Sequence, residues 1–194
     1  MDLIAGLKSE LFKPLVTLLV PGAIAVGPYV LVAHGRIPAC ETFWKEHSVA
    51  FVSVVLIGVI AAGLVLENIG SRIESGWDKL LGRKIKGFED DWHAYLRLRN
   101  TDDVVGQRYL RTILTRMKFE LSAAPALVFH IFGMLWVKWL FDVPTWLDLI
   151  IIIPFLIVLT IYLVWESFSS AKVLARVRVD IIASCRKDEK RPAT

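Results

Sequence analysis

Three glutamates are the residues best placed to do chemistry, because each stands where a long apolar run begins or ends. Glu67 follows one run, Glu120 precedes another and Glu166 follows a third. If the runs are helices of one bundle, the three carboxylates lie at about the same depth. In an oligomer they would then form an acidic ring that attracts cations. The alternative hypothesis pairs each carboxylate with a base at the wet interface, and the available bases are Lys13, Arg72, Arg116 and Lys118.

His130 is the other candidate for chemistry, because an ionisable side chain inside an apolar run is costly. One hypothesis gives it a role in proton relay or pH sensing. The interpretation we favour is a neutral imidazole bonded to a backbone carbonyl freed by Pro21, Pro28 or Pro154. Lys138, further along the same run, is expected to extend to water at the membrane surface.

The sequence lacks the motifs of common enzymes and metal sites. GxSxG, Walker-type GxxxxGK, HExxH and GxGxxG patterns do not occur. Glu89, Asp90, Asp91 and His93 carry metal-ligating groups, but on a helix they would point around most of the circumference, and no second cluster completes a site. We interpret them as solvated charge. We therefore expect no enzyme, no cofactor and no metal ion.

Composition indicates which elements position these residues. The chain has 194 residues, 55% of them hydrophobic, and a mean hydropathy of +0.55, which is more than one water-soluble core of this size can bury. The charged residues gather between the apolar runs. The net charge of +4 needs no nucleic acid as an explanation, since Lys and Arg beside apolar runs are retained in the cytoplasm.

Four apolar runs reach the roughly 17 to 25 residues that a helix needs to cross a bilayer. The fold class predicted is therefore an all-α membrane protein with four transmembrane helices. The expected spans are 15–33 and 48–66, forming a first hairpin, and 121–141 and 145–165, forming a second. An N-terminal lead (1–14), a helical loop (67–120) and a basic tail (166–194) complete the predicted organisation.

The distribution of Lys and Arg predicts the orientation. Twenty of these residues fall before the first span, between the second and third, or after the fourth, and three fall on the other side. By the positive-inside rule, both termini and the 67–120 loop are expected to be cytoplasmic. Cys40 and Cys185 then lie on opposite sides, so we expect no disulfide between them.

Glycine and proline predict local shape. Pro21, Gly22, Gly27 and Pro28 predict a kinked or locally broken first span, and the short 142–144 segment predicts an antiparallel hairpin. Small residues at helical spacing on the second span predict close helix packing, within one chain or between copies. They are Gly58, Ala62, Gly63 and Gly70.

Helical periodicity continues outside the apolar runs. Residues 67–81 are expected to prolong the second span, residues 104–120 to lead into the third, and residues 185–194 to be disordered. Basic and aromatic residues of the loop would contact anionic lipid or a soluble partner, or pack on the bundle base. They include Arg83, Lys84, Lys86, Trp92 and Tyr95.

Three short motifs carry a resemblance. LENIGSRIE at 66–74, W-x-x-Y-L at 92–96 and RYL at 108–110 resemble segments of uncharacterised small four-span bacterial inner-membrane proteins. The resemblance implies a bacterial location and a four-span plan, and attaches no activity to any residue.

Three functional hypotheses follow from these features. The first is a homo-oligomeric membrane module acting as a pore, channel-like effector or sensor, controlled through its cytoplasmic loop. The second is a non-conducting anchor or scaffold for a soluble partner. The third is a small proton-coupled transporter that uses His130 and a glutamate.

Overall fold

The computed structural model describes residues 3–84 and 104–189, with side chains for 15–80, 109, 110 and 112–177. Within these ranges the chain is all-helical. The helices are α1 (Leu3–Arg36), α2 (Pro38–Glu46), α3 (Ser48–Lys84), α5 (Val104–Phe141) and α6 (Trp146–Glu189). Four of them contain segments long and apolar enough to cross a membrane, namely Leu15–Arg36, Ser48–Leu80, Thr112–Phe141 and Trp146–Val177. The prediction of an all-helical chain with four candidate spans is confirmed, and it identifies a multi-pass membrane protein.

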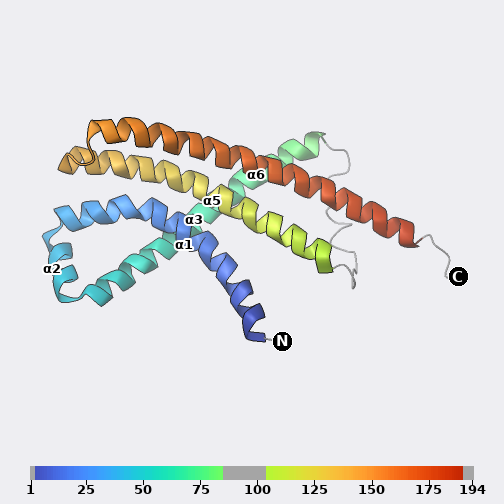
Figure 1. The fold of residues 1–194 in the computed structure, drawn as a ribbon, viewed down its shortest axis with the longest axis horizontal. Helices are drawn as coiled ribbons and strands as arrows, with labels where there is room; N and C mark the ends of the chain where they lie inside the picture. Colours follow the sequence, from blue (N-terminus) through green and yellow to red (C-terminus); the bar gives the residue numbers. More distant parts are fainter. Residues whose placement is uncertain (1–2, 85–103, 190–194) are drawn as a thin grey trace.

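Helix α5 lies at the centre of the bundle. It packs against α1, α3 and α6, and α1 also packs against α3. Figure 1 shows α5 and α6 running side by side as a hairpin, with α3 crossing behind them at a slant. The turn between α5 and α6 contains Asp142, whose φ of 57° lies in the left-handed region that aspartate tolerates better than most residues.

The molecule has two distinct ends. In Figure 1, α2 and the α5–α6 turn lie at one end, which we call the turn end. The first residues of α1 and α5 and the last residues of α3 and α6 lie at the other, the loop end. The segments predicted to share a side, 34–47 and 142–144, therefore do so.

Helix α1 is kinked but not broken. It is one continuous helix from Leu3 to Arg36, and Figure 1 shows it change direction on its way to the turn end. A proline removes one helical hydrogen bond and clashes with the preceding turn, which bends a helix without ending it when neighbouring helices support the backbone.

Two segments are more helical than the sequence indicated. Residues Pro38–Glu46, expected to be part of a loop, form α2 with proline in its first turn, a position for which proline's fixed φ is suited. Helix α6 continues to Glu189, so the expectation of disorder from Cys185 is wrong for residues 185–189. No glycine or proline occurs between Pro154 and Pro192 to end this helix earlier.

The predicted continuation of the second and third spans is confirmed, since α3 runs to Lys84 and α5 starts at Val104. Residues 85–103 lie outside the described part of the chain. They include Lys86, Trp92, Tyr95 and the cluster Glu89, Asp90, Asp91 and His93. The side chains of Lys13, Arg83 and Lys84 also lie outside it.

The packed interior is small and lies between helices. Met117 and Leu121 of α5 are buried with Ala171 of α6, and Ile73, Leu114 and Trp77 pack around them. By contrast, large apolar side chains of α6 such as Ile151 and Phe155 are exposed. Lipid tails are the solvent that such a surface requires.

Candidate functional site

The three glutamates singled out in the sequence lie among bases from α5. Arg116 Nε donates to Glu120 Oε1 at 2.8 Å, one turn further along the same helix. The same guanidinium donates through Nη2 to Glu166 Oε1 on α6. One arginine thus joins two helices through two carboxylates. A guanidinium suits this role because it presents several donors in a fixed plane.

Glu67 of α3 has a looser partner. Its Oε1 lies 4.0 Å from Lys118 Nζ, and both side chains are about half-exposed. Such a pair contributes little, because water screens it and two long side chains must be ordered. Two of the four bases offered by the sequence, Arg116 and Lys118, therefore face the glutamates, while Arg72 is exposed.

Glu120 is the most enclosed of the three carboxylates. It is 4% exposed, and among the described residues its Oε2 has no hydrogen-bond partner. Removing one partner of a buried ion pair costs several kcal/mol, because the other charge is left buried and unpaired. The hydrogen bond from Arg116 to the other oxygen is what offsets this cost, so Arg116 positions the α5–α6 contact.

A seam of small polar residues along α5 and α6 surrounds this cluster and was not singled out from the sequence. Ser122 and Ser167 are buried, and their hydroxyls donate to carbonyls of their own helices: Ser122 to Lys118 O at 2.9 Å, and Ser167 to Leu163 O at 2.7 Å. Ser170 and Ala171 are buried beside them. The spacing of these small residues on α6 was the available signal, because small side chains let membrane helices approach closely.

His130 is bound to the kinked helix. Its Nδ1 lies 2.8 Å from Ile24 O of α1, and since a carbonyl only accepts, Nδ1 carries the proton. In an α-helix the carbonyl of Ile24 would pair with the N–H of residue 28, which is a proline and has none. His130 thus supplies the donor that Pro28 lacks. It lies ten residues beyond Glu120, or about 15 Å along α5, so the structure does not bring the histidine and the glutamates together.

Lys138 does not extend into water as expected. It is 7% exposed, and its ammonium donates to Asp142 O at 3.2 Å and to the Asp142 carboxylate. It also lies 5.3 Å from the ring centroid of Trp146. The reason is the α5–α6 turn. It places the carboxylate and backbone carbonyl of Asp142, together with the indole of Trp146, around the lysine.

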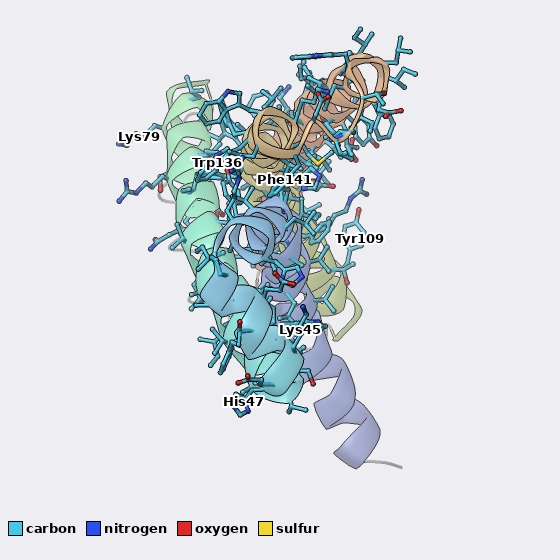
Figure 2. The ribbon with its side chains drawn as sticks, turned by 90° about the vertical axis from the view of Figure 1, so that its left-hand side faces the viewer. Lys45, His47, Lys79, Tyr109, Trp136 and Phe141 are labelled. Atoms are coloured by element: carbon cyan, nitrogen blue, oxygen red, sulfur yellow. The ribbon has the colours of Figure 1, made fainter. Side chains whose placement is uncertain are left out.

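The turn end is also covered by α2. Trp44 of α2 packs edge-on against Phe51 of α3 at 5.2 Å and lies near His34 of α1 at 6.4 Å. On the other side, Lys45 donates to Glu41 at 2.7 Å, and this bond and the lysine charge lower the pKa of Glu41. Figure 2, which looks onto this end, shows Lys45 close to the viewer. Helix α2 thus has the aromatic and charged faces of a helix that lies at a membrane surface.

The glycines expected to pack helices fall into two groups. Gly63 lies against the backbone of Leu18 on α1, and Gly70 lies against Leu121 on α5, so both are intrachain contacts. Gly58 has nothing within 4 Å of where a side chain would begin, and Ala62 is partly buried. Gly22 also packs closely, against Val59 of α3, and the sequence interpretation did not include it among the packing residues. The signal that could have identified it is its position between Pro21 and Pro28 of α1.

Among the described residues no group of three or more His, Cys, Asp or Glu side chains is arranged to hold a metal ion. The polar contacts between helices are charge pairs around Glu67, Glu120 and Glu166 and the backbone cap that His130 provides. Both hold helices in register. Comparison with protein-family models, with curated proteins and with solved structures finds no match for this chain.

Proposed function

We propose that the protein is a non-conducting membrane anchor that presents helices to a soluble partner at its loop end. The observation that carries this proposal is helix length. Helices α3, α5 and α6 have 37, 38 and 44 residues, or about 55 to 66 Å at 1.5 Å per residue. The hydrocarbon layer is about 30 Å thick, so each helix has more than enough length to project beyond it.

The projections share one side of the bilayer. Each of the three extensions leaves its candidate span toward the loop end. In the orientation favoured by the Lys and Arg distribution, this end is in the cytoplasm of a bacterial cell. Helices α5 and α6, joined by Arg116, Glu120 and Glu166, with α3 beside them, offer a platform for a protein partner.

A homo-oligomeric pore or channel-like sensor is the second candidate, and Glu67 is the observation that favours it. Its carboxylate is half-exposed, and its ion pair with Lys118 is weak, with Nζ and Oε1 4.0 Å apart. Several copies of the chain would therefore bring these acidic groups to a common axis. Glu120 and Glu166 contribute less to this candidate because Arg116 already binds both. A proton-coupled transporter ranks third, since His130 is committed to Ile24 O.

Ion flux through the purified chain in liposomes separates the first two candidates. The anchor predicts no flux above that of empty liposomes for the wild type, at neutral or acidic pH. The pore predicts flux that falls on Glu67→Gln substitution and persists on Lys79→Gln substitution, which alters an exposed charge on the same helix. Flux with that pattern would contradict the anchor proposal and support the pore.

Photo-crosslinking in cells tests for the partner directly. Lys79 and Tyr109 are exposed residues at the loop end, and Figure 2 shows them pointing away from the bundle on opposite sides. A photoreactive residue at either position is expected to capture a soluble protein. The same residue at Val54, which is exposed within the apolar part of α3, should not. Adducts with the same protein at all three positions would contradict the proposal.

A further inference from the structure

One exposed face of α6 changes from apolar to aromatic to basic along its length. Its side chains recur at intervals of three, four or seven residues, a spacing that places them on one side of the helix. They are Phe155, Val158, Tyr162, Trp165, Lys172 and Arg176, and all are exposed. This order matches the layers of a lipid leaflet, from acyl chain through glycerol to phosphate.

Two tryptophans mark how α6 sits in the bilayer. Trp146 is 65% exposed and Trp165 is 61% exposed, although both belong to an apolar helix. Position 165 follows position 146 by 19 residues, or about 28 Å of helix, which is close to the roughly 30 Å of the hydrocarbon layer. Indoles are stable at the membrane–water boundary. The surface of the leaflet at the loop end therefore lies near Trp165.

Lys172, beyond Trp165, reaches back toward that surface. Side chains of a helix lean toward its N-terminus, and for this part of α6 that direction leads to the membrane. Lys172 follows this rule, since its Nζ lies 4.4 Å from the ring centroid of Phe168, one turn earlier. Phe168 is in turn fixed edge-on against Trp77 of α3 at 5.5 Å. The ring of Phe168 thus gives the exposed ammonium a preferred position.

Lys172 and Arg176 have no acidic partner among the side chains that the structure describes. Within the part of the chain whose side chains the structure describes, no carboxylate oxygen lies within 4.0 Å of Lys172 or Arg176. This contrasts with Arg116, which binds two glutamates. Two cations, one turn apart on the same exposed face of α6, are together complementary to a phosphate group.

We propose that Lys172 and Arg176, with Tyr162 and Trp165 beside them, form a binding site for an anionic phospholipid in the leaflet at the loop end. The two cations bind the phosphate of the head group, the aromatic pair lies at the glycerol level, and Phe155 and Val158 contact an acyl chain. Phosphatidylglycerol has a net negative charge, whereas the choline cation of phosphatidylcholine neutralises its phosphate, so phosphatidylglycerol is the preferred lipid. This site goes beyond the proposed anchor function and does not require a protein partner.

Native mass spectrometry of the full chain in detergent tests the site. Phosphatidylglycerol and phosphatidylcholine with the same acyl chains are titrated separately, and the wild type is expected to bind the former more tightly. The Lys172→Gln/Arg176→Gln variant should bind phosphatidylglycerol about tenfold to thirtyfold more weakly, from roughly 1 kcal/mol per base. Its binding of phosphatidylcholine should not change.

The matched control is Arg72→Gln/Lys79→Gln, which removes the same charge from exposed positions on α3. Equal affinity of the wild type for the two lipids, or an equal loss in the control variant, would overturn the proposal. If circular dichroism shows that the test variant has lost helix content, phosphatidylglycerol binding is measured instead for the single Lys172→Gln variant and for the wild type at rising salt concentration. A preference for phosphatidylglycerol that salt leaves unchanged would also overturn the proposal, because a phosphate bound by exposed cations must be screened.

Discussion

Gly22 of α1 and Gly63 of α3 each lie against a carbonyl of the opposite helix. A Cβ on Gly22 would come within 2.0 Å of Val59 O, and one on Gly63 within 2.2 Å of Leu18 O. Val59 precedes Gly63 by four residues and Leu18 precedes Gly22 by four, so the contact is reciprocal. Each glycine faces the carbonyl to which the N–H of the other donates within its own helix. Close Cα–H···O approaches of this kind recur where membrane helices cross.

Substitution of either glycine should separate α1 from α3. We expect Gly63→Ala to lower the free energy of unfolding in detergent by about 1 to 3 kcal/mol, because backbone atoms cannot move aside as a flexible side chain can. Gly58→Ala, on the same helix but with open space around it, should be neutral or slightly stabilising. Unfolding followed by circular dichroism measures both. Equal destabilisation by the two substitutions would show that the crossing is not the cause.

Loss of Arg116 should destabilise the α5–α6 contact more than loss of Lys118. Arg116→Gln leaves the buried Glu120 without its charged partner, and since Arg116 is itself 56% exposed, we expect a cost of about 1 to 3 kcal/mol. Lys118→Gln should cost less than about 0.5 kcal/mol, because its pair is long and half-exposed.

The combination with Glu120→Gln gives the sharper measurement. In the double variant Arg116→Gln/Glu120→Gln, residue 120 no longer carries a charge that needs a partner. Part of the stability lost in Arg116→Gln should therefore return. Additive costs would mean that the two residues do not act as a pair. Chemical unfolding in one detergent, with all four proteins compared, provides the measurement.

His130 and Pro28 should be energetically coupled. His130→Ala removes the donor to Ile24 O and should cost about 1 kcal/mol. In a Pro28→Ala background the new N–H can satisfy that carbonyl, so the same substitution should cost less. A double-mutant cycle of unfolding free energies measures the difference. A cost that is identical in the two backgrounds would contradict the capping role and would return His130 to the candidates for proton transfer.

Cysteine labelling should locate the two ends. With Cys40 and Cys185 replaced by serine, Lys45→Cys on α2 is expected to react with a membrane-impermeant maleimide added to intact spheroplasts. Lys79→Cys should react only after the membrane is permeabilised. Both lysines are exposed, so accessibility within the protein does not decide the result. Labelling in the reverse pattern would invert the proposed orientation and place the loop end outside.

Helix existence could be predicted from sequence, whereas some boundaries could not. The spans and the continuity of α3 and α5 past the membrane followed from apolar run length and helical periodicity. Helix α2 was missed because nine residues between two spans carry little periodic signal. The helical end of the tail was missed because its charge suggested disorder, while the absence of glycine and proline before Pro192 favoured helix.

Four helices in a bilayer were determined by the sequence itself, because the thickness of the hydrocarbon layer translates directly into a length of apolar chain. Tertiary structure alone decided which side of each helix faces a neighbour. In a soluble helix the apolar stripe marks the interior, but these spans are apolar all round, so the stripe carries no such information. Their rotation is determined by close contacts and polar pairs between helices. Gly22 against Gly63, His130 at Ile24 and Arg116 between two glutamates are the contacts that determine it here.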